Sequence, residues 1–417
     1  MFHKISLFFL FFFSILNANA QTFSKEIIVG NASYNCNEPS ISINPNNPKY
    51  IAIATNKNHF FYSNNFGKNF KHYIAKSTLG VYGDPVLYFT SNHILYYIHL
   101  AQNKKFDWPE SFDQIVIQKS INHGKTLNNG IGIGKNGKMQ DKPWISVDEN
   151  INKNSYGNVY ITWTQFDKYG SENKNDSSRI LFAYSKNEGK IFSNPIIISD
   201  TSGDCKDGNN TVEGATTCID TNGNIYATWA AFGNIYFDKS IDNGKSFGKD
   251  KIIMKCSSGW ALNVPGFSRT NGLPFLNCDN YGNMFVVTSY EKNTFNNVFI
   301  SKSENNGDTW SDAISLQNDD STHYFMPHAF LDKKTGNYYI VYYQSKNFQT
   351  NIILSYKIFG EKNFKHLKVN TSSFKLNNDK LFMGDYINVC AVKNQISIVW
   401  TEKQNANTVV KTRNIFL

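Results

Sequence analysis

Short runs of apolar, β-branched and aromatic residues alternate with polar turn residues along most of the chain. Four of these runs start with the same Gly-Asn turn, and such a run after a tight turn is typical of the second strand of a β-hairpin. Weaker copies start at Lys49, His93 and Asn394, so the pattern predicts seven hairpins. The clear copies are GNVYITWTQF (157–166), GNIYATWAAF (223–232), GNMFVVTSYE (282–291) and GNYYIVYYQS (336–345).

A short apolar strand precedes each hairpin strand, and several of these strands begin with Pro. They read EPSISINP, DPVLYFTS, KPWISVDE, EGATTCID, LPFLNCDN, MPHAFLDK and GDYINVCA. A third strand and, after another turn, a fourth follow, so one unit is four antiparallel strands in about 55 residues. Because repeats of this period are typical of solenoids and propellers, we predict an all-β β-propeller of seven four-stranded blades, with six as the alternative.

A repeated phrase marks the turn between the third and fourth strands. It reads Ser-x-Asp/Asn-x-Gly-x-x-aromatic, and Leu127 replaces the aromatic residue in one copy. We expect the Ser and Asp/Asn side chains to hydrogen-bond backbone amides, the Gly to adopt a positive φ and the aromatic side chain to pack under the turn. The phrase is therefore a folding device and indicates no chemistry. Its five copies begin at Ser63, Ser120, Ser185, Ser240 and Ser303.

The two ends of the chain are expected to share one blade. The seventh unit stops at Leu417, within its third strand, and lacks a fourth. The apolar segment KEIIVGN, residues 25–31, can supply that strand, which would close the ring and cover two sheet edges. The sequence therefore predicts that residues 21–417 form a single propeller domain.

The first twenty residues predict a secretory signal peptide. Lys4 is the one charge, ISLFFLFFFSIL forms an apolar core, and the small residues of NANA precede Gln21. The apolar core is too short to span a bilayer comfortably. We therefore expect a protein that is secreted or periplasmic and has no membrane span. We also expect it to be a monomer.

The net charge of +9 suggests a nucleic-acid partner at first sight. The basic residues are nearly all Lys, however, and they are scattered among Asn residues with no long run. The only arginines are Arg179, Arg269 and Arg413. We therefore predict no nucleic-acid partner.

Six cysteines in an exported chain predict disulfide bonds. Two pairs are close in sequence, and the remaining two cysteines lie near opposite ends of the chain. Six cysteines allow fifteen pairings, so the sequence leaves the connectivity open. The expected nested scheme is Cys205–Cys218, Cys256–Cys278 and Cys36–Cys390.

The repeated turns resemble the Asp-box, or bacterial neuraminidase repeat, of sialidases and related propellers. The blade openings VYGDPVL, DKPWISVD, NTVEGA, RTNGLP and FMGDY resemble those of exported bacterial proteins described as sialidase-like or as glycosyl hydrolases. The resemblance implies a site on the face opposite the boxes and a carbohydrate or glycoconjugate as partner. The three arginines with which sialidases bind the carboxylate of sialic acid are not matched, because EPSISINP contains no Arg.

Five acidic residues are predicted to surround one mouth of the central channel. Glu38, Asp84 and Glu213 directly precede the opening Pro or Gly of their blades, Asp141 lies one residue earlier, and Asp385 opens the seventh blade. Such a ring could supply the paired carboxyl groups of glycoside hydrolysis, or bind a cation such as calcium. For each acid taken alone, the alternative is a carboxylate that merely caps an interblade turn.

Further candidates come from the same face. The resemblance places Tyr386 where sialidases carry a nucleophilic tyrosine, and Glu213 where they carry its glutamate partner. Arg269 and Arg179 are expected to orient an anionic or polar sugar, and His323 lies in a blade opening beside them. The histidines lack the spacing of a zinc site, so we predict no metal-binding residue and no resident cofactor.

Two longer insertions, residues 102–114 and 167–179, lie on this face. Their side chains Phe106, Trp108 and Tyr169 either stack on sugar rings or pack against their own blades. The leading interpretation is an exported, sialidase-like, carbohydrate-directed propeller that acts, if catalytic, as a glycoside hydrolase. The alternative is a non-catalytic propeller that binds glycan or protein at the cell surface.

Overall fold

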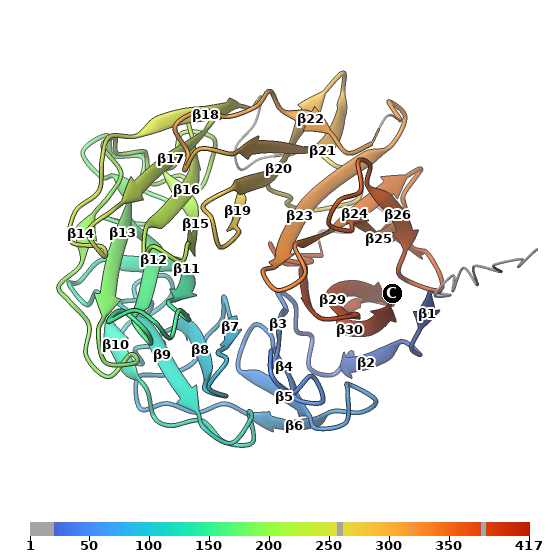
Figure 1. The fold of residues 1–417 in the computed structure, drawn as a ribbon, viewed down its shortest axis with the longest axis horizontal. Coiled ribbons are helices and arrows are strands. Elements are labelled where there is room, and N and C mark those ends of the chain that lie inside the picture. The colour runs from blue at the N-terminus through green and yellow to red at the C-terminus, as the bar shows by residue number, and fades with distance from the viewer. Residues whose placement is uncertain (1–20, 257–261, 318, 377–380) are drawn as a thin grey trace, which may run out of the picture.

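Seven antiparallel sheets surround a central channel as the blades of a propeller (Figure 1). The computed structural model describes residues 21–256, 262–317, 319–376 and 381–417, and in these ranges the chain forms strands and no helix. No helix long and apolar enough to cross a membrane therefore occurs in them. The prediction of seven blades is confirmed, and the six-bladed alternative is wrong. The predicted signal peptide lies outside the described residues.

Each of the first four blades consists of four consecutive strands, ordered from the channel outward. Blade 1 contains β3 (Ser40–Ile43), β4 (Ile51–Ala54), β5 (His59–Ser63) and β6 (Lys71–Ile74). Blade 2 contains β7 (Val86–Phe89), β8 (Leu95–Leu100), β9 (Ile115–Ser120) and β10 (Ile131–Ile133). Blade 3 contains β11 (Met139–Val147), β12 (Val159–Phe166), β13 (Ser178–Ser185) and β14 (Ile196–Ile197). Blade 4 contains β15 (Glu213–Ile219), β16 (Ile225–Ala231), β17 (Asn234–Ser240) and β18 (Lys251–Lys255).

The last three blades follow the same order, and blades 6 and 7 contain additional short strands. Blade 5 contains β19 (Phe275–Cys278), β20 (Met284–Lys292), β21 (Phe295–Ser303) and β22 (Ile314–Ser315). Blade 6 contains β23 (His323–Asp332), β24 (Asn337–Lys346), β25 (Gln349–Lys357) and β26 (Lys365–Lys368), and β27 (Phe374–Lys375) also pairs with β25. Blade 7 contains β28 (Asn388–Val392), β29 (Gln395–Gln404) and β30 (Asn407–Phe416), with β1 (Thr22–Phe23) and β2 (Ile27–Gly30) on its outer edge.

The N-terminal strands close the ring, as predicted. β2 pairs antiparallel with β30, so that Ile27 lies opposite Thr412, and β1 pairs with the end of the same strand. Val29 is buried in a cluster that joins blades 7 and 1. The first and last segments of the chain therefore form one blade.

The core lies between neighbouring blades. The apolar faces of adjacent sheets pack on each other, and large side chains of the middle strands fill the space between them. Trp163 on β12, Trp229 on β16 and Trp400 on β29 are at most 1% exposed. Because each blade is covered by the next one, the middle strands read as continuous apolar runs.

The repeated turns form the hydrogen bonds that the sequence predicts. In the copy that begins at Ser240, the Ser hydroxyl donates to Asp242 Oδ1 at 2.8 Å and accepts from the Gly244 N–H at 2.9 Å. Gly244 has φ +82°, and an added Cβ would lie 2.7 Å from the ring of Phe182. The other four copies repeat the bond from the Gly N–H to the Ser hydroxyl at 2.9 to 3.0 Å.

The predicted disulfide bonds are wrong. All six cysteines lie in the described part of the chain, and all six are buried free thiols. Cys218 contacts Cys278 instead of Cys205, because the inner strands β15 and β19 bring these two thiols together at the channel. Cys36 and Cys390 belong to one apolar cluster but are not bonded.

Candidate functional site

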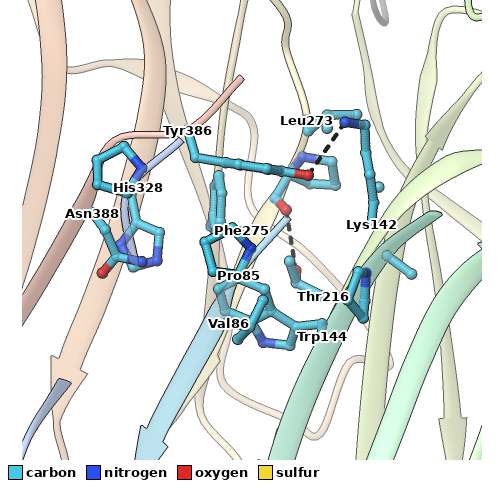
Figure 2. A pocket seen from close by; sticks show the side chains of 15 residues that line it. Pro85, Val86, Lys142, Trp144, Thr216, Leu273, Phe275, His328, Tyr386 and Asn388 are labelled. Atoms are coloured by element: carbon cyan, nitrogen blue, oxygen red, sulfur yellow. Dashed lines mark hydrogen bonds between the residues drawn. The ribbon is translucent and has the colours of Figure 1, made fainter. Parts of the chain in front are cut away.

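The central channel is lined by the inner strands of all seven blades and has a volume of about 250 Å³. A smaller pocket lies at one of its ends, and Figure 2 shows Tyr386 extending across it toward Lys142. The Lys142 ammonium group donates to the Tyr386 hydroxyl at 3.2 Å, and it lies 5.1 Å from the centre of that ring. Trp144, Phe275 and His328 line the same pocket.

A cleft of about 580 Å³ lies on the side of Lys142 away from this pocket. It is built from the loops that lead into the inner strands and from the loops that link the second and third strands, as the sequence predicts for the ligand face. The repeated turns lie at the other ends of the strands. Its lining includes Glu38, Asn56, Tyr82, Asp84, Trp108, Asp141, Lys142, Tyr169, Arg269, Phe382 and Asp385.

Local backbone bends direct several of these side chains into the cleft. Glu38, Asp84 and Lys142 all precede a Pro and all have a positive φ, of 50°, 50° and 45°. A non-Gly residue rarely adopts this conformation, and such outliers cluster at functional sites. In blade 3 the pairing between β11 and β12 also shifts register after Asp141, as in a β-bulge, which redirects side chains at a strand end.

Three carboxyl groups, the carboxyl trio of Glu38, Asp84 and Asp141, lie on the floor of the cleft, and Asp84 contacts the other two. Glu38 and Asp141 each share a hydrogen bond with Asp84, which requires protons because two carboxylates cannot donate to each other. Burial, and next the charge of Asp84, raises the pKa of Glu38 well above its ordinary range. Burial likewise raises the pKa of Asp141, although Lys142 acts against it. Glu38 and Asp141 therefore favour their protonated forms more strongly than exposed carboxyl groups do.

Asn56 and the backbone fix the trio in place. Asn56 donates to Glu38 Oε2 from its amide, and its oxygen accepts from the Asp84 N–H at 2.9 Å. Glu38 Oε1 accepts from the Asp385 N–H at 3.0 Å. Blades 1, 2 and 7 are thus joined through one set of hydrogen bonds at the cleft floor.

Asp385 is an ionised carboxylate between two cations. Its side chain is fully buried, 3.1 Å from Lys142 Nζ and 3.0 Å from Arg269 Nε, and it also binds Arg269 Nη2. Burial alone would raise the pKa of Asp385, but Lys142 and Arg269 lower it below its ordinary value. The same contacts raise the pKa of Lys142 against the effect of burial, so both groups stay charged.

Aromatic side chains form the rim of the cleft. Trp108 is 60% exposed and meets the ring of Tyr169 edge-on at 5.7 Å. The Tyr169 hydroxyl donates to Asp207 Oδ2 at 2.8 Å, which fixes the ring at the cleft. Of the three aromatic residues predicted for this face, Trp108 and Tyr169 line the cleft, whereas Phe106 is exposed outside its lining.

Several predicted site residues lie elsewhere. Arg179 binds Asp167 at 2.6 Å and Gln165 at 3.0 Å, and it lines a separate groove between the outer strands of blades 2 and 3. His323 packs against Phe295, with ring centres 4.8 Å apart, and is not part of the cleft lining. The expected placement of Arg179 and His323 beside the acids is therefore wrong, because their strands direct them toward their own blades.

Glu213 is also outside the cleft lining, and it does not pair with Tyr386. It is 2% exposed, and neither carboxyl oxygen has a hydrogen-bond partner among the residues that the structure describes. Burial, and next the charge of Asp207, raises the pKa of Glu213 well above its ordinary value of 4.5. The Tyr386 hydroxyl instead accepts from Lys142, and burial raises the pKa of Tyr386 too, so neither group is poised as an anion.

A Glu213→Leu variant is expected to be more stable than the wild type by about 1–3 kcal/mol, because a buried, unsatisfied polar group is removed. The folded state holds the Glu213 proton more tightly than the unfolded state, so the wild type loses stability as pH rises above about 4.5. The advantage of the variant should therefore grow between pH 5 and pH 7 in urea titrations. Glu213→Gln cannot ionise either, so its stability relative to the wild type should rise by the same amount over this pH range. A Leu variant that is less stable than the wild type at both pH values would contradict the account.

Sequence reasoning missed two residues that organise the cleft. Lys142 precedes Pro143 just as Glu38 and Asp84 precede their prolines, and this shared position was the signal that could have identified it. Asp207 lies in the loop before β15, where no repeated position marks it. Across the described ranges, no group of three or more His, Cys, Asp or Glu side chains is arranged to hold a metal ion, and Lys142 supplies the positive charge among the acids.

The sequence matches no family model and no curated protein, whereas the fold matches solved structures. A protein of unknown function from Dyadobacter fermentans is 11% identical, with a TM-score of 0.52 over 96% of this chain and 100% of that chain. The NanB sialidase of Streptococcus pneumoniae is 9% identical, with a TM-score of 0.51 over 88% and 83%. The polysaccharide lyase Uly1 is 10% identical, with a TM-score of 0.51 over 90% and 89%. At these identities the comparisons show the fold, a propeller of the kind found in sialidases and polysaccharide lyases.

Proposed function

We propose that this protein is an exported, carbohydrate-directed propeller that binds a glycan in the cleft and hydrolyses a glycosidic bond there. The observation that carries the proposal is a cleft with an exposed aromatic rim at Trp108 and buried carboxyl groups on its floor. The apolar face of a pyranose packs on an aromatic ring, and its hydroxyl groups suit carboxyl partners. The likeness in fold to a sialidase and a polysaccharide lyase supports the same class of ligand.

The carboxyl trio would supply the proton for this reaction. Glycoside hydrolysis needs a carboxylic acid that protonates the leaving oxygen, and a second carboxylate that attacks or activates water. These two roles can be assigned where the surroundings keep one of two neighbouring carboxyl groups protonated and the other ionised. Here burial favours the protonated forms of Glu38 and Asp141, whereas Asp385 stays ionised between Lys142 and Arg269. Lys142 lies 3.1 Å from Asp385 and 4.0 Å from Asp84, which places the two carboxylates within about 7 Å of each other.

A non-catalytic glycan-binding propeller is the second candidate. Asp84 contacts both other members of the carboxyl trio, whereas the two carboxyl groups of a glycosidase lie about 5–9.5 Å apart on either side of the bond. The Asp385 side chain is fully buried and cannot touch a sugar in this conformation. These two observations favour binding without turnover.

Replacement of Asp84 or Asp141 with Asn is expected to lower kcat/KM by about 10²–10⁴-fold, because each change removes one carboxyl group of the trio that would supply the proton. The measurement is the initial rate on a panel of aryl glycosides that includes a sialoside, together with glycan binding by calorimetry. Asp308→Asn is the matched control, because Asp308 pairs with Lys239 on the opposite face. Binding without turnover on any glycoside would favour the second candidate, and the absence of both would overturn the proposal.

A further inference from the structure

Arg269, an expected ligand for a sugar carboxylate, is already held by carboxylates of the protein. Its Nε and Nη2 bind the two oxygens of Asp385, and its Nη1 donates to Asp207 Oδ2 at 2.9 Å. Phe382 covers one face of the guanidinium, with the ring centre 4.8 Å from Cζ. A sugar carboxylate would need the two parallel N–H groups that Asp385 occupies.

Lys142, a buried cation of the cleft, is held in the same way. Its side chain is 6% exposed, and Nζ lies 3.1 Å from Asp385, 3.2 Å from Tyr386 and 4.0 Å from Asp84. Asp385 cannot give way to a ligand, because its departure would leave the buried Lys142 and the partly exposed Arg269 without their shared counter-charge. Lys57 also lines the cleft, but it is exposed at the rim, where water and salt screen its charge.

Six carboxyl groups surround Lys142 and Arg269 at the cleft. A ligand carboxylate would have to displace a carboxylate of the protein from one of these cations, whereas an uncharged or positively charged ligand would not. Glu213 lies next to Asp207 and Arg269, and within the described residues neither of its oxygens has a hydrogen-bond partner. The six acids are Glu38, Asp84, Asp141, Asp207, Glu213 and Asp385. Lys142 is buried, and Arg269 is partly exposed.

We infer that the cleft selects glycans without a carboxylate, either uncharged or amine-bearing, and rejects glycans that contain sialic or uronic acid. The inference rests on the proposed function and narrows its ligand. It also reverses the sequence-based expectation that Arg269 orients an anionic sugar, because this guanidinium serves to hold Asp385 and Asp207.

Calorimetric titration of the full chain with matched oligosaccharides tests the inference. The panel contains an N-acetylhexosamine oligomer, its de-N-acetylated form, and oligomers of equal length that carry sialic or uronic acid. We expect the carboxylate-free oligomers to bind at least tenfold more tightly than the acidic ones. Equal or tighter binding of an acidic oligomer would overturn the inference and leave the proposed function intact; binding of none would overturn both.

Asp207→Asn adds a gain-of-binding test. The substitution keeps a side chain that tolerates the positive φ of 58° at this position, and it removes the charge that Arg269 Nη1 faces. We expect the affinity for the acidic oligomers to rise several-fold relative to the affinity for the uncharged oligomers. Asp308→Asn on the opposite face should change neither affinity, and an Asp207→Asn variant with unchanged selectivity would contradict the role assigned to Arg269.

Discussion

Replacement of Asp385 with Ala is expected to lower the free energy of unfolding by about 3–5 kcal/mol, because it leaves the buried ammonium of Lys142 and the guanidinium of Arg269 without their shared carboxylate. The pKa of Asp385 is lowered in the folded state, so its stabilising effect is present above the ordinary value of 3.8 and is lost as pH falls further. Urea titrations at pH 7 and pH 3 measure both the size of the effect and its sign.

The control for this prediction is an exposed ion pair. Asp308 lies 2.8 Å from Lys239, but its side chain is 60% exposed, so Asp308→Ala should leave the free energy of unfolding nearly unchanged. Asp385→Ala with the same small effect would show that the network around Lys142 does not hold the blades together at the cleft.

Removal of residues 21–30 is expected to destabilise the protein by at least about 4 kcal/mol, because β30 loses its pairing with β2 on the outer edge of blade 7 and Val29 leaves the core. Removal of residues 21–23 alone should have a much smaller effect, since Thr22 and Phe23 are exposed. Tryptophan fluorescence during urea unfolding compares the two truncations with the chain that begins at Gln21. Equal stability of all three would contradict closure of the ring by β2.

The fold was predictable because each blade repeats the same local rules. The Gly-Asn turns define the hairpins, the Ser-Asp turns define the third and fourth strands, and the incomplete last unit requires a strand from the other terminus. The cysteines were not predictable in this way. Cys218 and Cys278 meet because inner strands of adjacent blades run side by side, and sequence separation does not encode that contact.

The candidate site was predictable only in part. The positions before the blade-opening prolines led to Glu38 and Asp84, and the same rule applied to every residue type would have led to Lys142. Glu213 precedes a blade-opening Gly instead, and it is buried outside the cleft lining. The predicted position of Arg179 at the channel mouth is wrong, because its long side chain binds Asp167 of the same blade.

A crystal structure with the tightest-binding oligosaccharide tests the central claim most directly. The account predicts a sugar ring against Trp108, with a hydroxyl or glycosidic oxygen within hydrogen-bond distance of Asp84 or Asp141. A sugar bound in the outer groove beside Arg179, or in the central channel, with the cleft empty would contradict it.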